Sequence, residues 1–453
     1  EAIPDTTGTT GKVGVGASVA TNIVANRTNA TVADGTTLTT PGSVTISAAA
    51  IRDITTKAEA GASGGTSVTP ALALSLVNNT TTAQLGTSDT AQQSAGDINI
   101  LASQQATEET AASGIAAGSE AAIGAAVAVA LVNDTVSATT LRDLNARNNV
   151  TLRSWGASLN TLEATASASG SEAADADGDA AAGQDSSVDA TVTSNLTHAS
   201  DQQDSADVGD TDQQQASADG AADESGRSAS TGEGTGKVTV AAAVGVNVQS
   251  SSVSAGVPDG KNITVGGMLT VATSNNTTAS VTTDGTAVGD ALAAVGIGAA
   301  VAVNVVHTNN DATLGNGTTT AGSINISALK FDVAKLMVGD PATAVTDTYL
   351  ASATSGAGSS SVGLAGSLAL NLVDTQSQAS IAGDAIVTLT GGDLTLASNN
   401  QTNSTATAVP DETGAAGGKV GVGASVALNI IANRSTATLG DDAVLTGAGD
   451  ITL

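Results

Sequence analysis

Three aspartates around a glycine in the middle of the chain are the first candidates for a chemical role. Asp175, Asp177 and Asp179 stand in the string SEAADADGDAAAGQD, with Gly178 between the last two. Carboxylate oxygens at this spacing suit Ca²⁺, a hard cation that prefers oxygen ligands. The string departs from an EF-hand loop, which needs D-x-D-x-D-G followed by a bidentate Glu. The three residues are therefore candidate calcium ligands, and the alternative is a solvated acidic loop, the commoner meaning of a charge run.

Other catalytic and metal chemistry has few residues available to it. The chain has no Cys and two His, His198 and His307, which fall at equivalent repeat positions and so indicate surface turns. Zinc sites need clustered His or Cys, and a phosphate-binding G-x-x-x-x-G-K-[ST] string is absent. Sugar-cleaving β-helices need aromatic side chains for stacking, but this chain has one Trp, one Tyr and one Phe. We expect no enzymatic activity.

The composition favours an ordered chain with a thin core. Of the 453 residues 40% are hydrophobic and 52 are Gly, and the apolar residues are mostly Ala, Val, Leu and Ile. Runs such as AVGIGAAVAVNVV are rich in β-branched residues, which disordered chains lack. Small side chains suit closely spaced strands, and Gly and Ala in VGVGAS would let two sheets approach more closely than Leu would allow.

The charge and hydropathy patterns limit the partners. Forty-three acidic and 14 basic residues give a formal net charge of −29, which disfavours nucleic acid and anionic membranes as partners. No stretch of about 18 uninterrupted strongly apolar residues predicts a transmembrane helix. The absence of Cys fits secretion of an unfolded chain without disulfide chemistry. The chain begins with Glu1 and shows no signal peptide, so we expect a fragment of a longer chain.

An apolar alternation that ends in one polar or small residue recurs along the chain. Successive plain copies are 53, 55, 117, 57, 67 and 58 residues apart, and the double gap predicts a hidden copy in VTSNLTHAS. Eight units of about 58 residues result. The anchor residues are Asn22, Ser75, Ala130, Asn195, Asn247, Asn304, Asn371 and Asn429. We expect the Asn residues among them to stack into a ladder of side-chain amides.

Each unit also carries a second recurrent string after a turn, such as GSVTISA or GDINILA. Period-two alternation bounded by Gly, Asn and Asp predicts short strands. Such units bury a face only by stacking, which predicts an elongated all-β solenoid, a right-handed parallel β-helix. We expect two rungs per unit and a length of about 75 Å. Helical periodicity is weak, with residues 51–60 and 329–337 as the alternatives.

Residues 171–235 differ in composition from the rest of the predicted solenoid, which otherwise runs continuously over 1–453. They hold 15 of the 43 acidic residues and one basic residue, Arg227, together with the degenerate anchor Asn195. We expect this stretch to be a poorly apolar repeat with protruding acidic loops. Ca²⁺ or monovalent cations could offset the self-repulsion of the acidic chain.

The repeats resemble those of giant bacterial filamentous adhesins, the leukotoxin-type and haemagglutinin-like surface proteins. The resemblance rests on VGVGASVATNIVANRTNATV, VGIGAAVAVNVVHTNNDATL and VGLAGSLALNLVDTQSQASI. It implies a secreted or surface-displayed bacterial fibre whose adhesive domain and host or cell-surface ligand lie elsewhere. Two roles stay open: a stalk that projects another domain, and a self-assembling extracellular filament or sheath that contacts like chains. A packed fibre would bury one apolar face, whereas a lone stalk would be polar all round.

Overall fold

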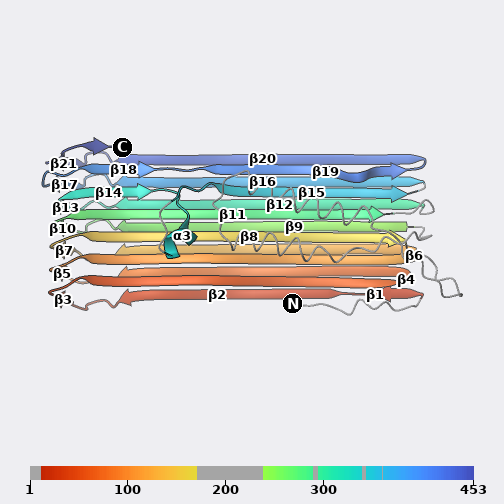
Figure 1. Cartoon of the computed structure of the whole chain (residues 1–453), viewed down its shortest axis with the longest axis horizontal. Coiled ribbons are helices and arrows are strands. Elements are labelled where there is room, and N and C mark those ends of the chain that lie inside the picture. The colour runs from red at the N-terminus through yellow and green to blue at the C-terminus, as the bar shows by residue number, and fades with distance from the viewer. Residues whose placement is uncertain (1–11, 171–237, 289–293, 339–342, 360) are drawn as a thin grey trace.

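The computed structural model describes residues 12–170, 238–288, 294–338, 343–359 and 361–453. Long parallel strands stack into an all-β solenoid (Figure 1). Each rung has a long strand on one face, a short strand at one end, and a long strand that returns on the opposite face. We call the two faces the anchor face, which carries the anchor residues, and the return face.

The anchor face has seven strands. In stacking order they are β1 and β2 (Val13–Val15 and Ser18–Val32), residues 66–85 of β4 (Val44–Leu85), residues 121–140 of β6 (Ile98–Thr140), β9 (Val238–Val257), β12 (Val295–Leu314), β16 (Val362–Ile381) and β20 (Val420–Leu439). Every neighbouring pair is parallel, and the anchor positions of adjacent strands lie opposite one another.

The return face is formed by the second long strand of each rung. It contains the first halves of β4 and β6, β8 (Val150–Gly170), β11 (Met268–Val288), β14 with β15 (Ser323–Ala328 and Asp347–Ser359), β18 with β19 (Leu394–Ser398 and Thr402–Gly417) and β22 (Ile451–Thr452). The short strands form a separate seven-stranded sheet. They are β3 (Thr39–Thr40), β5 (Gln92–Ser94), β7 (Leu144–Ala146), β10 (Ile263–Val265), β13 (Thr318–Ala321), β17 (Ile386–Leu389) and β21 (Val444–Thr446).

The prediction of two rungs per unit is wrong, because each unit makes one large rung. A strand such as β9 has 20 residues and spans about 66 Å, so the anchor strand and its return strand together use most of a unit. The second recurrent string is the start of the return strand in the same rung. Seven rungs about 4.8 Å apart give a stack about 34 Å high, half or less of the expected length. The parallel solenoid is confirmed, and the right-handed winding stays a prediction.

No eighth rung lies between the third and fourth rungs, where the unit around Asn195 was expected. The third and fourth rungs are direct neighbours on both faces: Ala130 pairs with Asn247, and Val150 pairs with Leu269. The double gap of 117 residues therefore contains an insertion between consecutive rungs. Residues 171–237, including Asn195, lie outside the described residues.

One short helix, α3 (Val333–Val338), occurs within the described residues, between β14 and β15. It overlaps the helical alternative at 329–337, whereas residues 51–60 are strand within β4. The Asp332 carboxylate accepts a hydrogen bond from the backbone N–H of Lys335 (3.1 Å), as an N-cap does.

The core has a wide end and a thin end. Near the short strands, where three strands enclose the interior, most of the buried hydrophobic side chains are Leu, Ile and Val, for example Leu85, Ile100 and Leu269. Farther along, the two faces meet directly and most of the buried hydrophobic residues are Ala. A Cβ added to Gly298 would lie 1.9 Å from the carbonyl oxygen of Gly356 on the return face. The expectation that Gly and Ala permit a close approach of two sheets is confirmed.

Candidate functional site

The candidate calcium ligands Asp175, Asp177 and Asp179 lie outside the described residues, as does His198. Within the described residues, no group of three or more His, Cys, Asp or Glu side chains could hold a metal ion. His307 is on the outer side of β12, where its Nδ1 lies 3.4 Å from Asp374 Oδ2 and more than half of its side chain is exposed. The expected surface position is observed, but His307 lies within a strand and not in the expected turn.

The remaining ladder residues lie in one column across the anchor face. Read along the stack, it contains Asn22, Ser75, Ala130, Asn247, Asn304, Asn371 and Asn429. Asn247 donates from Nδ2 to Asn304 Oδ1 (2.8 Å), which is the one amide-to-amide hydrogen bond within this column among the described residues. Asn304 and Asn371 instead donate to the return-face carbonyls of Ala279 and Tyr349, both at 3.0 Å. The expected ladder is therefore limited to the pair Asn247 and Asn304, because the amides of Asn304 and Asn371 tie the two faces together instead.

A buried carboxyl pair lies deeper in the same interior, between the second and third rungs. Glu108 on β6 and Asp134 on the same strand are 1% and 2% exposed. Asn79 donates from Nδ2 to Glu108 Oε1 (3.1 Å) and to Asp134 Oδ1 (2.8 Å), so one amide bridges the two carboxyl groups. Gln104 and Ser158 also donate to Asp134. The second oxygen of Glu108 has no hydrogen-bond partner among the described residues.

The electrostatics of this pair follow from burial. Loss of solvent, and then the neighbouring charge of Asp134, raise the pKa of Glu108 well above its ordinary value. Burial likewise raises the pKa of Asp134, although its hydrogen bonds oppose the change. Arg52 is the cation that acts on both carboxyl groups, and its guanidinium bonds to Thr28 and Gln104. The hydrogen bonds of this cluster link the second and third rungs inside the solenoid.

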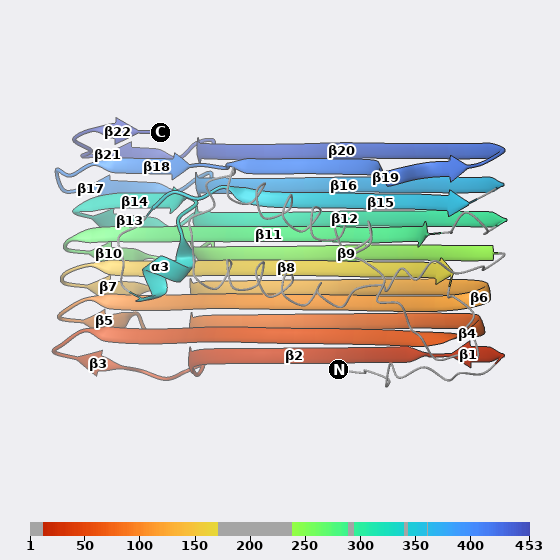
Figure 2. The ribbon, with the colours of Figure 1, turned by 45° about the vertical axis from the view of Figure 1, so that its right-hand side comes forward.

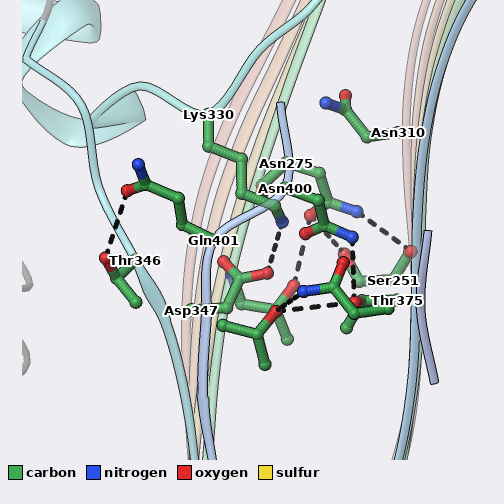
Figure 3. Close-up of polar contacts among 12 residues, drawn as sticks. Ser251, Asn275, Asn310, Lys330, Thr346, Asp347, Thr375, Asn400 and Gln401 are labelled. Atoms are coloured by element: carbon green, nitrogen blue, oxygen red, sulfur yellow. Dashed lines mark hydrogen bonds and ion pairs between the residues drawn. The ribbon is translucent and has the colours of Figure 1, made fainter. Parts of the chain in front are cut away.

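A second polar cluster lies where the return face is interrupted by α3. Lys330 and Asp347, each 1% exposed at the side chain, form an ion pair between the end of β14 and the start of β15 (Figure 3). Lys330 Nζ also donates to the carbonyl of Asn275 (3.0 Å). Asp347 accepts from the Tyr349 hydroxyl (3.0 Å) and from the backbone N–H of Thr277 (3.0 Å). Burial, and then the adjacent Asp347, raise the pKa of Tyr349 well above 10. The buried pair closes the break in the sheet.

A third buried carboxyl, that of Asp284, is on the outer side of β11. Burial raises its pKa to about 7, with the charges of Asp411 and Glu163 adding to the shift and a hydrogen bond from Thr286 opposing it. Asp411 lies on a bulge of β19, where the pairing with β15 shifts its register.

The sequence contained a signal for the inward carboxyls that the sequence analysis did not use. Glu108 has the same parity as Ile98 and Ile100, and Asp134 has the same parity as Ala128 and Ala130. Every second residue of a strand faces the same side. An acidic residue that shares the parity of the inward-facing positions is therefore expected to be buried.

The outer side of the anchor face is the most unusual surface of the protein. Along the first half of each anchor strand, the larger apolar residues point outward and the small residues point inward, as Val244 and Val246 do beside Ala243 and Gly245. We call this surface the apolar panel. It consists of alternate residues, starting from the first, of 13–23, 66–76, 121–131, 238–248, 295–305, 362–372 and 420–430.

No protein-family model, curated protein or solved structure matches this chain. No helix among the described residues has the length and apolar character needed to cross a membrane.

Proposed function

We propose that the chain is a non-enzymatic structural repeat region of a secreted or cell-surface protein of the filamentous-adhesin type, in which stacked rungs form a stalk. Its buried polar groups are used for bracing, because Glu108, Asp134, Lys330 and Asp347 are sealed inside the solenoid. A stalk needs a fold that can be lengthened without changing its cross-section, and stacked parallel rungs satisfy that need.

The observation that carries this proposal is the near-identity of the anchor strands of the first and last rungs. GKVGVGASVATNIVANRTNATVADG at 11–35 returns as GKVGVGASVALNIIANRSTATLGDD at 418–442. In the structure these strings form opposite ends of the stack, β1 with β2 and then β20 (Figure 2). In the first rung, β1 and β2 pair with residues 66–85 of β4. Because β20 has nearly the same sequence as β1 and β2, its free edge could pair with a strand like residues 66–85. Six rungs form a higher-order repeat that can continue in the same register.

A second candidate function, the self-assembling filament or sheath subunit, is favoured by one observation. The apolar panel leaves one face of the solenoid covered with exposed aliphatic side chains. A lone stalk surrounded by water would gain nothing from such a face.

The stalk proposal is tested by lengthening the chain by one higher-order repeat. Residues 47–453 would be repeated directly after Leu453, since Leu453 corresponds to Ile46 of the first rung. Electron microscopy or small-angle scattering should show one continuous body about 29 Å taller along the stacking axis, which is six rungs of about 4.8 Å. Two separate bodies joined by a flexible segment would contradict the proposal, and the original chain is the control.

A further inference from the structure

The apolar panel is exposed across the full height of the stack. Fifteen of the 22 large hydrophobic side chains that are exposed in the described structure belong to it. Exposure is 75% for Ile23 and 63% for Val19 at one end, 44% for Leu131 and 40% for Val248 in the middle, and 56% for Val426 at the other end. Fraying of a terminal rung therefore does not explain the panel.

The core does not explain the panel either. The interior behind it is filled by Ala and Gly, and a Cβ on Gly124 would lie 2.2 Å from the carbonyl oxygen of Ser167. Because the core is thin, the inward-facing residues must be small. The thin core does not determine which residues point outward. The outward positions instead switch from apolar to polar at one line across the strands, with Asn78, Asn133, Ser250, His307 and Asp374 as the first polar residues beyond it.

The size of the panel suits a protein interface. Seven strands about 4.8 Å apart and eleven residues of about 3.3 Å each give about 34 Å by 36 Å, or about 1,200 Å². The largest apolar patch on a typical monomer is about 300–600 Å². A standard stable interface buries about 800 Å² on each partner. The panel alone is therefore large enough to hold two chains together.

Shape and charge identify the partner. The strands lie side by side with little fanning in both views (Figures 1 and 2), and flat sheets of many strands are typically stabilised by stacking on another sheet. The chain carries a net charge of −29, which repels copies from one another. The polar half of the anchor face, however, has two acidic residues, Asp311 and Asp374, and two arginines, Arg27 and Arg434. This side is neutral overall, so a second copy can approach it.

We propose that two copies of this chain pack face to face through their apolar panels, forming a four-layered sandwich with a two-fold axis near Val244. The same patch then serves both copies, as in other isologous interfaces. The outward positions of the return face are mostly polar, with Thr161 and Thr282 among them, and several, such as Thr354, are buried. This face therefore offers no second apolar panel, and pairing ends at two copies in the lateral direction. The inference concerns this pair alone and holds whether the chain serves as a stalk or as a filament.

The test measures the mass of the purified chain by light scattering or sedimentation from about 1 to about 100 μM. We expect twice the 43.1 kDa of one chain. Val244→Lys places a charge at the panel centre and should weaken association at least about tenfold. Thr161→Lys makes the same change on the outer side of the return face and should leave association unchanged. Circular dichroism would verify that both variants keep their sheet content.

A second variant covers the case in which Val244→Lys fails to fold. The chain has no Cys, so Ala242→Cys introduces a single thiol beside the proposed axis. Mild oxidation should link two copies through this residue, whereas Thr161→Cys should not link them. A chain that stays monomeric over the whole range overturns the proposal. Equal weakening of association by Val244→Lys and Thr161→Lys also overturns it. A monomer that floats with neutral phosphatidylcholine vesicles would likewise overturn it and would assign the panel to a lipid surface.

Discussion

Replacing Gly298 with alanine should destabilise the protein strongly, because the thin core has no room for a methyl group at this position. The added Cβ would lie 1.9 Å from the carbonyl oxygen of Gly356 and 2.6 Å from that of Gly285. Both obstacles are backbone atoms of the return face, so a side-chain rotation cannot relieve the contact. Overpacking typically costs about 1–3 kcal/mol, and a clash with two backbone oxygens belongs at the upper end. Replacing a glycine within a strand by alanine on its own stabilises the fold by about 0.5–1 kcal/mol. The net loss in the free energy of unfolding is therefore about 2 kcal/mol.

The chain offers a matched control at the equivalent position of the last rung. Gly298 lies opposite Ala365, which lies opposite Gly423 on β20. A Cβ at Gly423 would meet only the Cβ of Ala415, at an ordinary 3.7 Å. Gly423→Ala should therefore be neutral or stabilise the protein by about 0.5 kcal/mol.

Urea unfolding followed by circular dichroism would measure the difference between the two variants. The fluorescence of Trp155, the single tryptophan, reports on the third rung and would show whether the interior unfolds with the rest. For a slope of about 2 kcal/mol per molar urea, the two midpoints should differ by about 1 M. Equal midpoints would refute the conclusion that the backbones of the two faces are in close contact at Gly298.

Two further predictions concern the buried charges. Burial and Asp134 raise the pKa of Glu108 above its unfolded value of 4.5, so its contribution to stability is full below about pH 4.5 and is lost as the pH rises. Glu108→Gln should therefore reduce the loss of stability between pH 4.5 and pH 8 in urea unfolding, and an unchanged loss would contradict the assignment. Lys330→Met should destabilise the protein by about 3–5 kcal/mol, because it leaves the buried Asp347 carboxylate without its cation. Lys335→Met, on a partly exposed lysine of α3 that pairs with Asp332, should cost much less, and equal costs would show that the buried pair has no special role.

The sequence predicted the kind of fold but not the size of its rung. Alternation of Val, Ile and Leu with small residues indicates strands, and repetition indicates stacking, so the parallel solenoid followed. The number of rungs depended on where the chain turns, and the alternation continues through that turn. β6 runs as one strand from Ile98 to Thr140 across both faces, and Gly118 lies at its bend. The bend of β4 contains Gly64 and Gly65, but the chain has 52 Gly residues, so glycine alone did not distinguish a bend from the interior of a strand.

The site was predicted less well, for two physical reasons. The register of the anchor column followed from the repeat, yet which amides bond to which partners depends on the return face, whose distance along the sequence varies. Asn304 bonds Ala279, and Asn371 bonds Tyr349, from different separations. The sequence did not locate the apolar panel, because alternation of larger and smaller side chains identifies the two sides of a strand without showing which side faces the core. The convention that larger apolar residues are buried fails here, since the core admits only small ones.

The near-identity of the first and last anchor strands has a consequence for how such a protein can evolve. Two almost identical strings 407 residues apart invite recombination between their coding sequences. Joining Lys419 to Gly11 would delete six whole rungs, and the reverse event would add six. The longer product would keep the anchor column, the short-strand sheet and the outward aliphatic rows aligned. The height of the molecule can thus be increased in a single genetic event that leaves every lateral contact surface continuous.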